Sequence, residues 1–246
     1  MERYLHSPSG SLRLTAPVEV SDWLLAFDPT RFGSTVPVGS PVPPARLVAN
    51  TSTAAYEQLL AQVAQSTPTP VEFLGRPSLW HAWTAGGAIV TTPSRELVFV
   101  FVDDGVGVVG PTTSQVAMST GVLAAAWLQQ QAWRAGWHLV HGSCFVLDGA
   151  GVLCLGDKGS GKSALAIAAG RSLGADVIAN DRCLLSVDSG VVRVCALPQA
   201  VAVGFGLLSA LGLSPAVATA ARAGSCGTRA CMGLGCLLPS PAGATS

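Results

Sequence analysis

The chain has 246 residues, of which 49% are hydrophobic and 11% are charged, and its formal net charge is zero. About a quarter of the residues are charged in a typical soluble domain. This composition therefore excludes a highly charged, disordered chain and predicts a sizeable buried core. Because Lys and Arg are neither in excess nor clustered, we expect no binding to nucleic acid and no attraction to a membrane surface.

The chain has seven cysteines, an odd number, and no Cys-x-x-Cys pair. Cys144 and Cys154 lie in apolar, strand-like runs, so they are expected to be buried free thiols, and a reducing cytoplasm is the expected compartment. The start of the chain has no apolar run of the kind found in signal peptides, which also favours a cytoplasmic protein. A zinc site in the tail is an alternative, although such sites usually draw four ligands from paired spacings. Its ligands would include Cys226, Cys231 and Cys236.

The sequence predicts a small α+β region over residues 1–110, which could pack on the same core as the rest of the chain. Some strand is expected around residues 12–20, before an irregular, proline-rich connection. Residues 54–65 carry apolar side chains at helical spacing, so a helix is expected there. Its candidate N-caps are Thr51, Ser52 and Thr53.

The next stretch is rich in β-branched residues, which favour strands. Strands are predicted at residues 88–92, 96–103 and 107–109, with Asp104-Gly105 as the hairpin turn between the last two. A long helix is predicted over residues 112–133, and Gly136 is its expected stop signal. The predicted helix face carries Val116, Leu123, Trp127 and Gln130.

Residues 111–222 predict a nucleotide-binding domain of α/β class with a mixed sheet. Its expected strands lie at residues 138–147, 152–155, 176–179, 183–187 and 191–197. A glycine-rich loop follows the second of these strands, and a helix over residues 163–171 follows the loop. The tail, residues 223–246, has no hydrophobic period and is expected to be irregular or disordered.

The glycine-rich loop matches the phosphate-binding pattern Gly-x4-Gly-Lys-Ser. Glycines let the backbone turn its N–H groups inward and approach phosphates closely. In such loops the lysine reaches the β- and γ-phosphates and the serine hydroxyl ligates Mg²⁺. We therefore expect ATP and Mg²⁺ as cofactors, and the alternative is a chance glycine-rich turn before a helix. The predicted binding residues are Gly156, Asp157, Lys158, Gly159, Ser160, Gly161, Lys162 and Ser163.

Two side chains outside the loop complete the predicted site. Asp181 follows the strand after the loop helix, where a carboxylate can contact Mg²⁺ together with Ser163. Its alternative is a solvated turn. His141 lies in the strand hairpin before the loop and could reach the triphosphate, although a lone histidine is more often structural. The candidate catalytic residues are His141, Asp181 and Lys162.

Several of these segments together resemble the catalytic domain of HPr kinase/phosphorylase, over roughly residues 136–211. They are His141-Gly142-Ser143, the hairpin and loop that follow, and Ala179-Asn180-Asp181-Arg182. The resemblance implies a fold like that of phosphoenolpyruvate carboxykinase and ATP-dependent, Mg²⁺-dependent phosphorylation of a serine hydroxyl. It also implies that Lys162 and Ser163 hold the triphosphate and the metal, with His141 near the transferred phosphoryl group.

Two residues depart from that family pattern. The family has a pair of aspartates where this chain has Asn180-Asp181, and a glutamate where it has Ala164. The first aspartate of the pair resembles a general base, and an amide cannot accept a hydroxyl proton. Three functions therefore stay open. The first is a kinase acting on a hydroxyl of a peptide, protein or small molecule, as in tailoring of a modified peptide natural product. The second is an ATP-binding pseudokinase or regulatory module, and the third is a partner-binding scaffold; formation of a homo-oligomer is also open.

Overall fold

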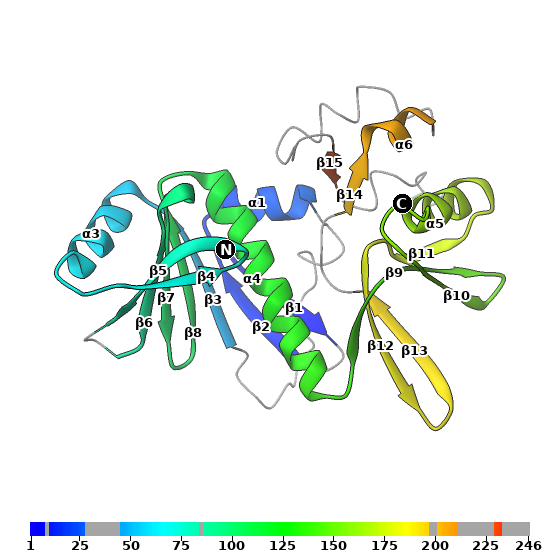
Figure 1. The fold of residues 1–246 in the computed structure, drawn as a ribbon, viewed down its shortest axis with the longest axis horizontal. Helices are drawn as coiled ribbons and strands as arrows, with labels where there is room; N and C mark the ends of the chain where they lie inside the picture. The colour runs from blue at the N-terminus through cyan, green and yellow to red at the C-terminus, as the bar shows by residue number, and fades with distance from the viewer. Residues whose placement is uncertain (8–9, 28–44, 84–85, 197–200, 211–228, 233–246) are drawn as a thin grey trace. The chain divides into compact units, whose positions relative to one another are not determined.

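The computed structural model describes residues 1–7, 10–27, 45–83, 86–196, 201–210 and 229–232. It is an α/β structure that divides into two compact units, Met1–Leu128 and Gln129–Ser246 (Figure 1). The division falls within a long helix, α4 (Thr113–Arg134), whereas the sequence placed a boundary after residue 110. Most of the tail 223–246, with its predicted irregular structure, lies outside the described residues.

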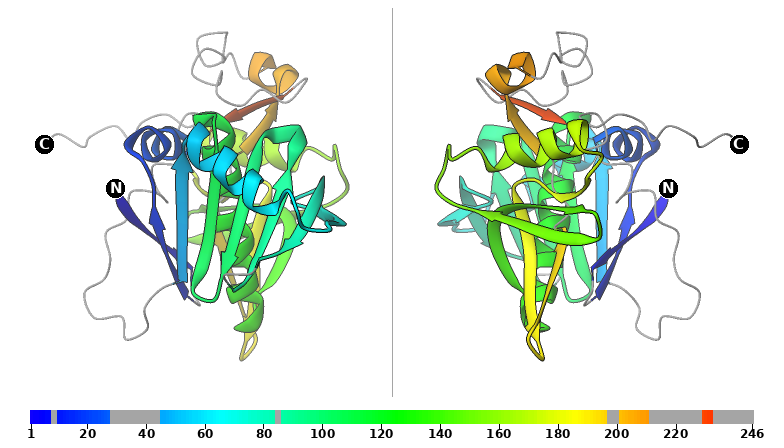
Figure 2. Two further views of the ribbon diagram at one scale, coloured as in Figure 1. Left: turned by 90° about the vertical axis from the view of Figure 1, so that its left-hand side faces the viewer. Right: turned by 90° about the vertical axis from the view of Figure 1, so that its right-hand side faces the viewer.

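The first unit is built on an eight-stranded sheet with the order β1-β2-β3-β8-β7-β6-β5-β4 (Figure 2, left). β2 pairs with β3 and β3 with β8 in parallel, and the other pairs are antiparallel. The predicted α/β class is thus confirmed, but the mixed sheet, predicted for residues 111–222, lies instead in the region that was expected to be small. The strands are β1 (Glu2–Ser7), β2 (Gly10–Thr15), β3 (Ala45–Thr51), β4 (Thr69–Phe73), β5 (Arg76–Ala82), β6 (Ala88–Thr92), β7 (Leu97–Val102) and β8 (Gly105–Gly110).

Helices cover both faces of this sheet, and the central strand β7 contributes apolar side chains to the core on each face. Leu97 and Phe99 pack in the core that α4 and α1 (Val18–Phe27) share with the sheet. Val98 alternates to the other face and packs with side chains of α3 (Thr53–Val63). A 3-10 turn, η1 (Pro93–Arg95), joins β6 to β7. The first unit is therefore a helix–sheet–helix sandwich.

Three local predictions in the first unit can be compared with the structure. Ser52 is the N-cap of α3, since its Oγ accepts a hydrogen bond from the Ala55 N–H at 3.2 Å. The strand expected at residues 12–20 ends earlier, and the helix α1 begins at Val18. The β7–β8 turn is Asp103-Asp104, because Gly105 already pairs with Val102 in the sheet. The proline-rich connection lies outside the described residues.

The helix α4 has nearly the predicted extent, and most of its predicted face packs in the core. Val116 is fully buried, and Leu123 and Trp127 are partly buried against the same core. The fully buried side chains of α4 also include the small residues Ala117, Thr120 and Ala124, which let the helix lie close to the sheet. The Thr120 hydroxyl donates to the Val116 carbonyl at 2.7 Å and so remains satisfied in the core. Gln130, expected on the buried face, is exposed.

The predicted stop of α4 at Gly136 is confirmed. Gly136 has a φ of +80°, in the left-handed region that glycine tolerates. The Trp137 N–H bonds to the Ala132 carbonyl at 2.9 Å, and the Gly136 N–H bonds to the Trp133 carbonyl at 3.0 Å. These two bonds satisfy carbonyls that the helix end would otherwise leave unpaired. The chain then turns directly into β9 (His138–Leu147).

His81, on β5, is buried between two hydroxyl groups of the first unit. Its Nδ1 lies 2.7 Å from Ser66 Oγ, and its Nε2 lies 3.2 Å from Thr91 Oγ1. Burial lowers the pKa of His81 from its ordinary value of 6.5, because the charged ring is poorly solvated there. The folded chain therefore binds fewer protons than the unfolded chain when the pH falls below 6.5.

We expect the free energy of unfolding to decrease as the pH is lowered below 6.5, since the unfolded state takes up the extra proton. The contribution of neutral His81 to stability is fully present above pH 6.5 and is lost towards lower pH. His81→Gln should flatten this dependence, whereas His138→Gln, at an exposed position, should leave it unchanged. Denaturant unfolding between pH 5 and 7.5 measures the slopes, and equal slopes in wild type and His81→Gln would contradict the assignment.

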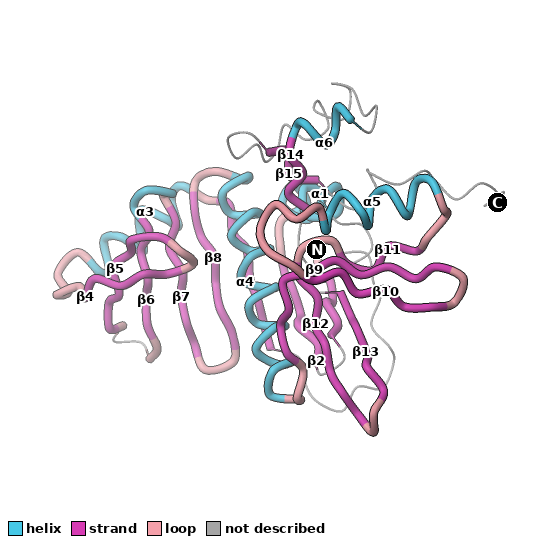
Figure 3. Tube along the Cα trace, turned by 45° about the vertical axis from the view of Figure 1, so that its right-hand side comes forward, coloured by secondary structure: helices cyan, strands magenta, loops and turns pink. Residues whose placement is uncertain are grey.

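The second unit is built around β9, which pairs with strands on both of its edges (Figure 3). Its five-stranded sheet has the order β10-β9-β12-β13, with β11 also paired to β9, and every pair in it is antiparallel. The predicted strands at residues 138–147 and 176–179 match β9 and β11. The other elements are β10 (Ala150–Leu155), α5 (Lys162–Ser172), β11 (Asp176–Ala179), β12 (Arg182–Asp188), β13 (Val191–Ala196), β14 (Val201–Gly204), α6 (Phe205–Ala210) and β15 (Arg229–Met232), where β14 pairs with β15.

Candidate functional site

The strand pairing of the second unit places the ends of two strands beside β9. β10 ends with Leu155 opposite Gly142, and β11 ends with Ala179 opposite Cys144. Because both strands run antiparallel to β9, they are parallel to each other, and α5 is the crossover between them. The glycine-rich loop after β10 and the residues after β11 therefore emerge at the same end of the sheet, near the middle of β9.

The glycine-rich loop, residues 156–163, connects β10 to α5. Gly159 and Gly161 each have a φ of +88°, which a residue with a side chain rarely adopts. Gly161 is the N-cap of α5, and no side chain caps the first turn of the helix. The amide N–H groups at this helix start, at the positive end of its dipole, can therefore be donated to an anion.

Lys162 folds back over the loop. Its Nζ donates to the carbonyl oxygens of Gly156 at 2.7 Å and Asp157 at 2.8 Å. The ammonium charge is thereby held at the mouth of the loop, next to the helix start. A phosphate oxygen there would form a charge-assisted hydrogen bond with the same group, which is stronger than a bond to a neutral carbonyl.

Ser143 fixes the start of α5 on the sheet, a role that the sequence analysis did not assign. Its side chain is completely buried, and its Oγ donates to the Lys162 carbonyl at 2.8 Å. Ala166 and Ala169 of α5 pack against Phe145, further along β9. The only sequence signal for this anchor was the position of Ser143 in the His-Gly-Ser run before the loop.

Ser163, the predicted metal ligand, lies against the end of β11. Its Oγ donates to the backbone carbonyl of Asn180 at 3.1 Å. The Asn180 side chain is 5% exposed, and neither its Oδ1 nor its Nδ2 has a hydrogen-bond partner among the described residues. Buried polar groups in native proteins are nearly always paired, so this carboxamide requires an explanation.

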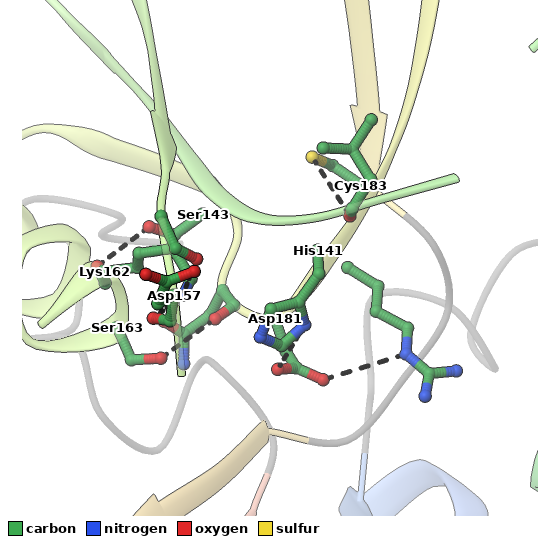
Figure 4. Close-up of polar contacts among 11 residues, drawn as sticks. His141, Ser143, Asp157, Lys162, Ser163, Asp181 and Cys183 are labelled. Carbon is green, nitrogen blue, oxygen red and sulfur yellow. Dashed lines mark hydrogen bonds and ion pairs between the residues drawn. The ribbon is translucent and has the colours of Figure 1, made fainter. Parts of the chain in front are cut away.

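His141, on β9, and Asp181, in the bend between β11 and β12, point toward one another (Figure 4). His141 Nδ1 lies 3.4 Å from Asp181 Oδ1, and Arg182 Nε lies 4.0 Å from the other carboxylate oxygen. The side chains of His141 and Asp181 are 56% and 38% exposed, so a substrate can reach both. An exposed pair of this kind contributes little to stability. Its geometry instead suits a histidine whose ring is oriented by a carboxylate.

The dipeptide Asn180-Asp181 joins the two halves of the site, which are the glycine-rich loop with Ser163 and the side chain of His141. Ser163 bonds to the backbone of Asn180, while His141 contacts the side chain of Asp181. The polar groups around this junction fit a magnesium-bound triphosphate. The helix amides and the ammonium group can donate hydrogen bonds to phosphate, the hydroxyl and the carboxylate can ligate the metal, and a buried carboxamide is unpaired. Asp157, Lys158 and Ser160 are exposed in the loop. The roles of the individual residues remain predictions.

Cys183, beside the site on β12, is not a suitable nucleophile. Burial raises the pKa of its thiol to about 11, and the nearby Cys144 adds to the rise. Its Sγ faces the Val140 carbonyl at 3.9 Å. The pKa of Cys144 is also raised, first by burial and then by Cys154. Both thiols are therefore neutral at physiological pH. The predicted buried free thiol is confirmed at Cys144, whereas Cys154, also predicted to be buried, is only partly buried.

We expect iodoacetamide at pH 8 to alkylate Cys183 and Cys144 much more slowly than Cys154, which is only partly buried. The thiolate is the reacting species, so both the raised pKa and the burial slow the reaction. Peptide mapping by mass spectrometry measures the three rates, and labelling of the unfolded chain is the control. Alkylation of native Cys183 as fast as Cys154 would contradict the placement of its side chain.

The described residues contain no group of three or more His, Cys, Asp or Glu side chains that could hold a metal. The tail cysteines of the alternative zinc site, Cys226, Cys231 and Cys236, have no described side chains. None of the described helices combines the length and apolarity needed to cross a membrane.

Comparisons with known proteins add no relative to this picture. No protein-family model matches the chain, and no curated protein matches it significantly. The functional argument therefore depends on the geometry around the Asn180-Asp181 junction and on the sequence motifs that form it.

Proposed function

We propose that this chain is an ATP-dependent kinase that transfers the γ-phosphoryl group to a hydroxyl of a peptide, protein or small molecule. The observation that carries the proposal is the junction at Asn180-Asp181. There the residue after the loop lysine, Ser163, bonds to one member of the dipeptide, and His141 contacts the other. A triphosphate held on the loop would thus lie next to a histidine that can take up a proton.

Each residue of the site has a chemical task in this proposal. Lys162 and the amides of the loop bind the phosphates, and Ser163 and Asp181 contact Mg²⁺, which when bound neutralises phosphate charge. The acceptor oxygen forms a bond to the γ-phosphorus as the bond to the β–γ bridging oxygen breaks, and ADP leaves. The acceptor proton passes to His141, whose ring Asp181 orients. Positioning and charge neutralisation supply most of the rate in such reactions.

We also propose that residues 136–211 form a catalytic domain of the HPr kinase type. Two features support this assignment. The first is the order of His141, loop and Asn180-Asp181 along the chain. The second is the strand arrangement, in which β9, carrying His141, lies between β10 and β11. A cytoplasmic location belongs to the same proposal, supported by the free thiols of Cys144 and Cys183.

A pseudokinase is the second candidate, and Asn180 is the observation that favours it. If this position requires a general base, the amide removes it, and the chain would bind ATP without turning it over. Loss of a general base costs about 10²–10⁴-fold in rate. His141 can replace that base in the present geometry, which is why we place the kinase first.

Acceptor-dependent formation of ADP tests the proposal. The protein is incubated with Mg²⁺, γ-labelled ATP and a panel of serine peptides and small alcohols, and label is followed into the acceptor. The kinase predicts transfer that EDTA abolishes. Saturable binding of ATP with no transfer to any acceptor would favour the pseudokinase. Absence of both binding and transfer would contradict both candidates and leave the scaffold.

A further inference from the structure

The Asn180 carboxamide is the most unusual polar group in the described part of the second unit. Its side chain is 5% exposed, yet both of its polar atoms lack hydrogen-bond partners among the described residues. Such a group destabilises the protein that carries it, unless a ligand, an ion or water completes its bonds. The position of the amide indicates which of these is expected.

Asn180 lies between the two halves of the candidate site. Its own carbonyl accepts the hydrogen bond from Ser163 Oγ at 3.1 Å. Its neighbour Asp181 lies 3.4 Å from His141. The unpaired amide therefore belongs to a residue that touches the predicted metal-binding hydroxyl and adjoins the predicted proton acceptor. A metal-bound nucleotide on the loop would lie close to this residue and could supply its missing hydrogen bonds.

The chemistry of a carboxamide matches such a ligand better than that of a carboxylate. An amide offers one acceptor, Oδ1, and a donor group, Nδ2. Waters around a magnesium ion offer donors, and phosphate oxygens offer acceptors, so the hydrated complex can satisfy both ends. A carboxylate at this position would only accept, and its negative charge would repel phosphate until a metal is bound.

We propose that Asn180 is a ligand-binding residue for a magnesium-bound nucleoside triphosphate, rather than the remnant of a lost base. The inference deepens the proposed function and rests on it. In this account the buried amide is left unpaired in the free protein and becomes paired on binding. Part of the binding free energy thus comes from satisfying a group that destabilises the free state.

The test uses Asn180→Leu, which keeps the approximate volume but removes both polar atoms. Thermal unfolding of the free protein and titration with Mg²⁺ and a non-hydrolysable ATP analogue are measured on the full chain. We expect the free variant to unfold at a higher temperature than wild type and to bind the analogue at least about tenfold more weakly. Asn50→Leu, which replaces an exposed amide, is the control and should change neither quantity.

The two possible failures can be told apart. If wild type binds the analogue and Asn180→Leu binds it equally well, this inference is wrong while the proposed function stands. Lower stability of the free variant with unchanged binding would mean that the amide is a structural group satisfied by internal water. If wild type itself does not bind, the proposed function fails and the inference fails with it.

A second variant, Asn180→Asp, guards against misfolding of the leucine variant because it retains the shape of the side chain. We expect it to bind the analogue several-fold more weakly than wild type in EDTA and to recover affinity as Mg²⁺ is added, since the added charge repels bare phosphate. An unchanged affinity in EDTA would place the side chain away from the phosphates and overturn the inference.

Discussion

Replacing Lys162 with alanine should abolish phosphoryl transfer and weaken ATP binding strongly. The ammonium group is held at the mouth of the glycine-rich loop by the carbonyls of Gly156 and Asp157, 2.7 and 2.8 Å away. Hydrogen bonds to a charged group are worth about 1.5–3 kcal/mol. We therefore expect a loss of roughly 10- to 100-fold in ATP affinity. Loss of charge stabilisation in the transition state should lower the rate by a further ~10²–10³-fold.

Calorimetric titration measures the affinity change, and label transfer measures the rate. Arg193→Ala is the matched control, because it removes one positive charge from an exposed ion pair with Asp188, on the β12–β13 hairpin. That control should bind ATP as wild type does. Because the Lys162 ammonium is exposed, its removal should change the free energy of unfolding only slightly. Unchanged nucleotide affinity in Lys162→Ala would show that the loop is not the binding site.

The second large effect is expected at Asp181. Asp181→Asn keeps the size of the side chain but removes the charge that faces His141 Nδ1 at 3.4 Å. The variant should lose both the orientation of the histidine and one contact to Mg²⁺. We expect transfer to fall by about 10²–10⁴-fold, the range typical for loss of an acid or base function. The concentration of Mg²⁺ needed for half-maximal binding of ATP should rise.

Asp188→Asn controls for the loss of one negative charge, since Asp188 is an exposed acid paired with Arg193. Binding of ATP measured in EDTA should not weaken in Asp181→Asn, because the carboxylate does not attract phosphate. A residue of the metal site should change ATP binding only when Mg²⁺ is present, whereas a purely structural residue should change binding with and without Mg²⁺. Full transfer activity in Asp181→Asn would contradict the roles of both Asp181 and His141 in the account.

The sequence predicted the second unit more accurately than the first. β9, the loop, α5 and β11 have strong local signals, because apolar runs are separated by glycine-rich turns. In the first unit β1, β3, β4 and β5 were not anticipated. β1 with β2 and β4 with β5 form local hairpins, whereas β3 pairs with strands distant in sequence, as between Leu12 and Ala45. Local patterns carry little information about such partners.

The exposed Gln130 shows a different limit. Its position on the expected buried face of α4 followed from spacing, but near this end of the helix Leu128 and Ala132 are the fully buried side chains. Spacing alone does not show where a buried stripe ends along a long helix.

At the candidate site, motifs supplied the residue types and the fold supplied their contacts. The loop pattern identified Lys162 and Ser163 from sequence alone. The contact of His141 with Asp181 depends on the register that pairs His141 with Arg182, which no local pattern reveals. The unpaired amide of Asn180 is a property of burial and was visible only in the structure. From the sequence alone, Asn180 indicates only a lost acid.

A crystal structure with Mg²⁺ and a non-hydrolysable ATP analogue would show directly whether the loop binds the triphosphate. We expect the phosphates on the amides of the loop and on Lys162, with the metal near Ser163 and Asp181. The terminal phosphate should lie beside His141, and the Asn180 amide should be hydrogen-bonded to the ligand. A nucleotide bound elsewhere, or an empty loop at saturating analogue, would contradict the claim that this chain binds and transfers phosphate at residues 156–163.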